Sequence, residues 1–150
     1  MNSEKSKLLA ICFANVDARI ALAKEAMQHA QESANLEEKS SAGDKYETGR
    51  AMAQIERDQA AQQLDEALKL KDALLQIQPS VTYTHVVPGS LVITGKHRFF
   101  IAISLGKINL EGKEYFVISS HSPIGRSLFM RKVSDTFTFN NRFETIQQIL

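Results

Sequence analysis

Apolar residues in the first part of the chain recur at alternating steps of four and three positions. The pattern runs from residue 9 to residue 34, and its members are Leu9, Phe13, Val16, Ile20, Ala23, Met27, Ala30 and Ala34. Such steps place one apolar stripe along a helix and are typical of a coiled-coil seam. A second, less regular seam follows between residues 60 and 75, where Lys71 interrupts the apolar positions. The pattern therefore predicts two long helices.

The stretch "EEKSSAGDKYETGRAMAQ", residues 37–54, separates these two seams and lacks large aliphatic residues over most of its length. A seam as apolar as the first needs a partner helix, and the nearest partner is the next segment folded back antiparallel. If the helices run from about Leu8 to Ile77, the midpoint falls at Ala42–Gly43, and each arm reaches about 45 Å at the rise of an α-helix. One continuous helix in a parallel dimer is the alternative, which Gly43 and Gly49 argue against because we expect both glycines to let the chain turn. We predict an antiparallel coiled-coil hairpin over residues 1–78, with an acidic tip near residues 40–48.

Two carboxylates, Asp44 and Glu47, stand at this bend. Asp as an N-cap with Glu three residues later resembles a capping box, which would begin the second helix. Carboxylate oxygens at a tip could also bind a divalent cation. Two carboxylates are too few for a tight site, so such a metal would be shared with another molecule. The two interpretations are compatible, and both stay open at this point.

The second half of the chain reads as short β-strands separated by turn signals. The predicted strands are Ser90–Gly95, Arg98–Gly106, Lys113–Ser120, Asp135–Phe139 and Arg142–Leu150. Pro123 and Gly125 indicate a turn, and Arg126–Lys132 a short helix after it. Together with Pro79, the change in composition marks a boundary near residues 78–82. We predict an α+β chain whose second domain, residues 79–150, has four or five antiparallel strands and one short helix.

Charge and cysteine content limit the function classes. Residues 1–79 hold 10 Lys and Arg against 13 Asp and Glu, and residues 80–150 hold 8 against 4. This excess of cations is too small to predict direct nucleic-acid binding. The single Cys12 excludes an internal disulfide and a cysteine metal cluster. With neither a signal peptide nor an 18-residue apolar span, the expected location is the cytoplasm, without a membrane partner.

The remaining candidate groups favour structural roles. No acidic partner stands at ligand or triad spacing from His85, His97 or His121, so we interpret these as surface or hydrogen-bonded histidines. Ser119, Ser120 and Ser122 do not make a hydrolase site with His121, because neighbours along a strand point to opposite faces. Seven aromatic residues could line a prolyl-isomerase pocket, but at strand positions a core is the better interpretation: Phe99, Phe100, Tyr115, Phe116, Phe129, Phe137 and Phe139.

Two separated stretches resemble one family, the Gre transcript cleavage factors of bacterial RNA polymerase. "SPIGRSLFMRKVSD", Ser122 to Asp135, is similar to the C-terminal signature of that family, in which Ser-Pro-Ile-Gly-Arg precedes a Leu and a basic pair or Gly-Lys. "GDKYETGRAM" resembles the family's tip motif, Gly-Asp-x-x-Glu-Asn, through Gly43, Asp44 and Glu47, with Thr48 in place of Asn. The resemblance implies an N-terminal coiled coil followed by a small FKBP-like domain.

The resemblance also implies a mechanism. A Gre factor docks its globular domain at the rim of the polymerase secondary channel and inserts the coiled coil toward the catalytic centre. Asp44 and Glu47 would then help to hold a Mg²⁺ ion shared with RNA polymerase, which cleaves backtracked RNA. Ser122, Pro123, Ile124 and Gly125 would belong to the docking loop.

On this interpretation the chain is a monomer and not itself an enzyme. Its partners are RNA polymerase and the RNA 3′ end, with a further contact to DNA left open. A secondary-channel regulator that does not stimulate cleavage, and an FKBP-like chaperone or prolyl isomerase, are the alternatives.

Overall fold

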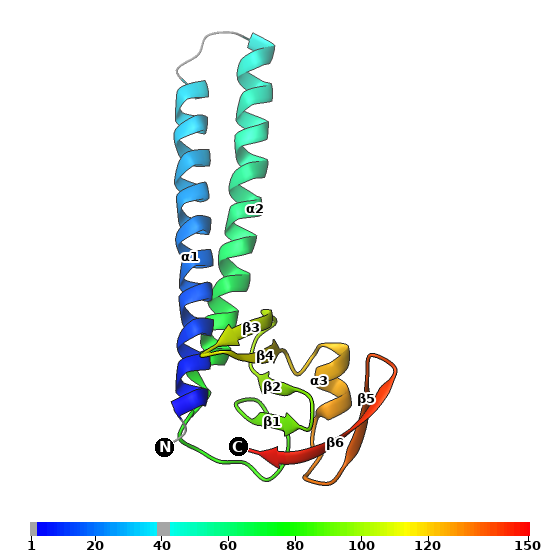
Figure 1. The fold of residues 1–150 in the computed structure, drawn as a ribbon. Coiled ribbons are helices and arrows are strands. Elements are labelled where there is room, and N and C mark those ends of the chain that lie inside the picture. The colour runs from blue at the N-terminus through cyan, green and yellow to red at the C-terminus, as the bar shows by residue number, and fades with distance from the viewer. Residues whose placement is uncertain (1–2, 39–42) are drawn as a thin grey trace. The chain divides into compact units, whose positions relative to one another are not determined.

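Two long helices begin the fold, as the apolar pattern predicts. The computed structural model describes residues 3–38 and 43–150, without the side chains of residues 37–38 and 43–47. Helix α1 spans Ser3–Glu38 and α2 spans Gly43–Leu75, and the two run antiparallel (Figure 1). The predicted order, a helical hairpin followed by a small sheet, is confirmed.

The chain divides into two compact units, one formed by residues 14–71 and one by residues 1–13 with 72–150. The first turns of α1 and the end of α2 thus belong to the same unit as the sheet. The boundary expected near residues 78–82 falls between α2 and the first strand, which begins at Leu91. The division into domains 1–78 and 79–150 stays a prediction.

The hairpin unit, residues 14–71, is held by a seam of mostly small side chains. The buried residues of this seam are Val16, Ile20, Ala23 and Ala30 on α1, and Ala53, Ala60 and Ala67 on α2. The three α2 alanines lie seven positions apart, which keeps them on one face of the helix. Gly49 lies inside α2, so the expectation that it lets the chain turn is wrong. One glycine costs a helix only about 1 kcal/mol relative to alanine, which a long packed helix tolerates.

The second unit contains a six-stranded sheet in the order β3-β4-β2-β1-β6-β5. Its strands are β1 Leu91–Thr94, β2 Arg98–Ile101, β3 Gly106–Leu110, β4 Lys113–Ile118, β5 Thr136–Phe139 and β6 Arg142–Ile149. Neighbouring strands pair antiparallel except for β2 and β4, which pair in parallel, Phe99 opposite Phe116. The sequence-based expectation of four or five strands, all antiparallel, is therefore wrong in number and in one pairing.

The missed strand, β3, explains this difference. Residues 98–106 were expected to form one strand, but β2 ends at Ile101 and β3 begins only at Gly106, which has φ +80°. Glu111 and Gly112 both have positive φ, as a two-residue hairpin turn requires, and β3 runs up to Leu110 immediately before them. The sheet core consists of Val86, Val92, Phe99, Ile101, Ile118, Leu128, Phe137, Ile146 and Ile149.

The beginning of α1 is tied to the sheet within this unit. The Tyr115 hydroxyl of β4 donates a hydrogen bond of 2.5 Å to Glu4 Oε2, and Lys7 forms an ion pair with Glu111. Burial and the bond to Glu4 raise the pKa of Tyr115 to about 12. These contacts join the first turns of α1 to the sheet within this unit.

Candidate functional site: the docking loop and the hairpin tip

The short helix α3 spans Pro123–Leu128 and carries the loop that the family resemblance assigns to docking. It begins three residues before the predicted helix at Arg126–Lys132 and also ends earlier. Ser122 caps it: its hydroxyl oxygen accepts a hydrogen bond from the Gly125 N–H at 3.1 Å. Pro123 follows at the first helical position, where its missing N–H costs nothing. Ser-Pro was therefore a helix start and not the turn that we expected.

The same loop is closed onto the end of β4. Ser119 O accepts hydrogen bonds from the Ser122 N–H at 3.1 Å and from its hydroxyl at 2.6 Å. A Cβ on Gly125 would lie 2.0 Å from that carbonyl oxygen. Only glycine fits there, because real Cβ atoms essentially never come within 3.0 Å of a heavy atom beyond their own residue and its two chain neighbours. The glycine of "SPIG", Gly125, is therefore required by the close approach of the Ser119 carbonyl group.

The four residues of the expected docking loop differ in exposure. Pro123 is exposed, Ser122 and Ile124 are half-buried, and Gly125 is buried. Ile124 packs against the core of the sheet. Within this loop Pro123 is therefore the residue most open to a partner, whereas Ile124 and Gly125 hold the loop in shape. Their contact with a polymerase stays a prediction.

The exposed apolar residues after α3 are a feature that the sequence reasoning missed. Phe129, which we expected in the core, is 51% exposed, and so is Met130. The prediction that Phe129 lies in the core failed because of helix periodicity. Ile124 and Leu128 are four positions apart and share the inward face of α3, so Phe129 points elsewhere. The spacing from Ile124 would have shown this.

The aromatic residues of the sheet form a packed cluster, as expected for a core. The rings of Phe99, Phe116 and Phe139 have centroids 5.2–5.6 Å apart. The His97 ring lies against the same three rings, 5.0 Å from Phe139. This packing favours a structural role for the aromatic residues over an isomerase pocket.

His97 has an acidic partner that lies far from it in the sequence. Its Nδ1 lies 2.8 Å from both carboxylate oxygens of Glu144, and the Thr94 hydroxyl donates to Glu144 Oε1 at 2.6 Å. His97 and Glu144 are 47 positions apart, so no local spacing could reveal the pair. It confirms His97 as a hydrogen-bonded histidine.

The tip residues Asp44 and Glu47 fall on the first turns of α2, which begins at Gly43, one residue before the predicted N-cap. Their side chains lie outside the described residues, and their role toward a metal stays a prediction. Within the described part of the chain, no group of three or more His, Cys, Asp or Glu could hold a metal ion. Nor does any helix there have the length and apolarity to cross a membrane.

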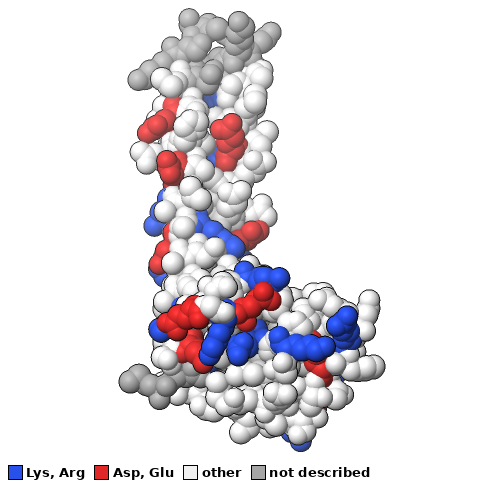
Figure 2. All heavy atoms as spheres, in the orientation of Figure 1, with Lys and Arg blue, Asp and Glu red and all other residues white. Residues whose placement is uncertain are grey.

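The charged surface does not favour direct binding of nucleic acid. On the face seen in Figure 2, Lys and Arg are interspersed with Asp and Glu. Lys107 and Glu114 form one such pair at 3.7 Å. Mixed signs give a phosphate backbone no continuous basic surface on this face.

Comparison with known proteins adds little to this geometry. A scan against protein-family models gives no match, and neither does a search of curated proteins. One solved structure, described as that of the transcription factor Gfh1, is 16% identical, with a TM-score of 0.32 over 93% of this chain and 90% of that chain. At such values the likeness shows neither a shared family nor a shared function.

Proposed function

We propose that this chain is a transcription factor that binds RNA polymerase and stimulates cleavage of backtracked RNA. The observation that carries the proposal is the placement of two motifs. "SPIG" lies on a capped, glycine-dependent loop of the sheet unit, and "GDKYE" lies at the beginning of α2. These are the two places that the resemblance to Gre factors requires.

Asp44 and Glu47 are three positions apart in the sequence. Two carboxylates suit Mg²⁺, which prefers oxygen ligands, but they leave most of its octahedron to other donors. The polymerase supplies those donors in this proposal. A Mg²⁺ ion held jointly activates a water molecule and offsets charge on the phosphodiester.

The chain is therefore not an enzyme by itself: Asp44 and Glu47 complete a site whose catalytic power belongs to the polymerase. The sheet unit acts as the docking body, through Ser122 and the exposed Pro123. The RNA 3′ end is the substrate that the completed site meets.

The test is RNA cleavage in a stalled, backtracked elongation complex of the cognate polymerase. We expect the protein to shorten the transcript in the presence of Mg²⁺, and the Asp44→Ala/Glu47→Ala variant to lose this effect while still binding the polymerase. Asp58→Ala/Asp65→Ala is the matched control, because it removes the same charge from exposed positions of the same helix.

Full cleavage by the tip variant would refute the metal role. Binding without any shortening by the unmodified protein would instead favour a regulator that occupies the channel, the alternative that Thr48 in the tip motif keeps open. Xaa-Pro isomerisation of a short peptide would indicate the FKBP-like alternative.

A further inference from the structure

The segment that follows α3 presents two consecutive large apolar side chains to solvent. Phe129 and Met130 are each 51% exposed. Two hydrogen bonds tie their backbone to a neighbouring segment of the same unit: the Met130 N–H donates to Val86 O at 2.8 Å, and the Val86 N–H donates to Arg131 O at 2.9 Å. The exposed pair is therefore held on a backbone that the fold fixes.

Met130 has a backbone conformation that glycine would adopt more easily. Its φ is +64°, in the left-handed region that residues with a side chain rarely occupy. Of the five non-glycine residues with positive φ in the described part of the chain, it is the one apolar residue. Strain of this kind concentrates at functional sites. Because half of the side chain is in solvent, the position favours a contact of Met130 with another molecule.

The charges along these two segments have one sign. Residues 119–134 contain three cations, Arg126, Arg131 and Lys132, and no Asp or Glu, and residues 81–90 contain neither Lys and Arg nor Asp and Glu. Arg126 and Lys132 are exposed, and Arg126 lies one helical turn before Phe129. The next acid along the chain is Asp135, whose Oδ2 accepts a hydrogen bond from the Lys132 N–H at 2.9 Å. The exposed apolar pair thus has cations on both sides in the sequence.

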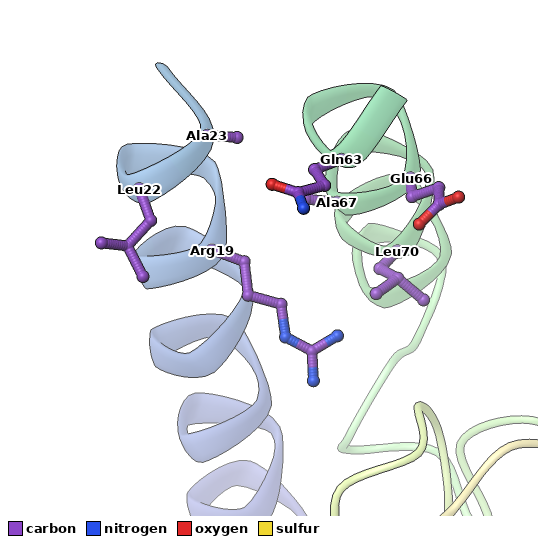
Figure 3. A pocket seen from close by; sticks show the side chains of 7 residues that line it. All are labelled: Arg19, Leu22, Ala23, Gln63, Glu66, Ala67 and Leu70. Carbon is purple, nitrogen blue, oxygen red and sulfur yellow. The ribbon is translucent and has the colours of Figure 1, made fainter. Parts of the chain in front are cut away.

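The exposed apolar surface of the hairpin unit differs in this respect. Leu22 is 67% exposed and lines a hollow between α1 and α2. Arg19 and Glu66 line the same hollow, so charges of both signs border it (Figure 3). Mixed charges do not specify the chemistry of a partner, whereas the single sign of the charges around Phe129 and Met130 does.

We propose that Phe129 and Met130, bordered by Arg126 and Lys132, bind a protein surface on which an apolar residue is flanked by Asp or Glu. Aromatic residues, Met and Arg are enriched in protein interfaces, and charges of opposite sign make two surfaces complementary. A phosphate backbone would pair with the cations but would leave both apolar side chains uncovered, so a protein suits this surface better than a nucleic acid does.

The assignment of the partner rests on the proposed function. On that function the partner is RNA polymerase, and this surface extends the docking loop from the exposed Pro123 past the end of α3. The polymerase surface that receives it would then be acidic around an apolar centre.

The test is the affinity of the full chain, labelled at its N-terminus, for the cognate RNA polymerase without nucleic acid, measured by fluorescence anisotropy. We expect Phe129→Ser to weaken binding roughly tenfold, because a few apolar anchors carry most of the energy of an interface. Arg126→Glu/Lys132→Glu should weaken it by a similar factor and make Kd less dependent on salt. Phe143→Ser and Lys96→Glu are the matched controls, since both residues are exposed in the same unit and lie outside the two segments.

Met130→Gly separates a contact with the partner from a role in folding. Glycine accepts the positive φ of this position, so the variant should be about as stable as the unmodified protein in urea unfolding. We expect it nevertheless to bind the polymerase roughly fivefold more weakly. A destabilised variant that binds as tightly as the unmodified protein would assign Met130 to the fold and contradict the proposal.

The other outcomes distinguish this surface from the proposed function. If the unmodified chain binds the polymerase and every variant binds equally well, the surface is wrong and the proposed function stands. If the variants bind weakly but the unmodified chain does not stimulate cleavage, the surface is supported and the cleavage role fails. A chain that binds single-stranded RNA but not the polymerase, and loses this binding in Arg126→Glu/Lys132→Glu, would assign the surface to nucleic acid and overturn the proposal.

Discussion

Lys5 is an unusual residue because its side chain is fully buried in the unit that contains the sheet. Its ammonium group donates a hydrogen bond of 2.6 Å to Val81 O and lies 4.8 Å from the centre of the Tyr83 ring. Burial lowers the pKa of Lys5 from 10.5 to about 8, because the charged form is poorly solvated there. Holding this charge inside therefore costs stability at neutral pH.

The lowered pKa predicts how stability depends on pH. Between about pH 8 and 10.5 the unfolded chain binds more protons at Lys5 than the folded chain does, so the contribution of Lys5 to the free energy of unfolding rises with pH. We expect the unmodified protein to gain stability relative to Lys5→Met between pH 7.5 and 9.5, measured by urea unfolding. Cys12 and Tyr115, whose pKa values are raised, act in the opposite sense, but both are present in the variant as well, so the difference between the two proteins reports on Lys5. If the unmodified protein instead lost stability relative to Lys5→Met as the pH rose, the result would contradict a buried ammonium group.

At the scale of elements, two polar contacts differ in burial although both join distant segments. Glu144 of β6 is 5% exposed and accepts from Thr94 and His97 at the β1–β2 turn. Asp17 of α1 is 53% exposed and pairs with Lys71 of α2 at 2.8 Å. Exposed ion pairs contribute little because water and salt screen them, whereas a buried donor left without its acceptor is costly.

We therefore expect Glu144→Ala to lower the free energy of unfolding by about 2–4 kcal/mol and Asp17→Ala by less than about 1 kcal/mol. Urea unfolding of both variants at one pH and salt concentration provides the comparison. Equal losses would mean that the Glu144 carboxylate is not the acceptor on which the turn depends.

Across the whole chain, the two compact units have cores of different composition. Alanines dominate the buried seam of residues 14–71, whereas Phe, Ile and Leu fill the core of the sheet. A buried Phe, Ile or Leu contributes about 1.5–3 kcal/mol, far more than alanine can. The hairpin unit therefore has less apolar burial to hold it closed.

Amide hydrogen exchange should reveal this difference. We expect amides between Ala23 and Ala30 to exchange through local opening at a lower free energy than those of β1 and β2, because less apolar surface is exposed when the hairpin opens. Native-state exchange in low concentrations of denaturant measures both sets in one sample. Equal opening energies would indicate that the chain unfolds as a single cooperative unit.

The amino-acid sequence by itself determined the elements that depend on local pattern. Steps of four and three from Leu9 to Ala34 predicted a long helix and its apolar seam, and the bend fell close to the gap between α1 and α2. The loop at Ser122 is a short contiguous motif that the sequence also brings out, whereas the roles of Asp44 and Glu47 and of this loop stay predictions. The loop's shape follows locally too, since Ser122 and Pro123 begin α3.

Only the tertiary structure decided the contacts between positions far apart in the chain. The parallel pairing of β2 with β4 and the bond from His97 to Glu144 have no signature in neighbouring residues. The same is true of the Gly125 position, where the constraint comes from Ser119 O folding back onto the helix. Periodicity reports which face of one element is apolar, but the identity of the group that covers that face depends on how the remaining elements close around it.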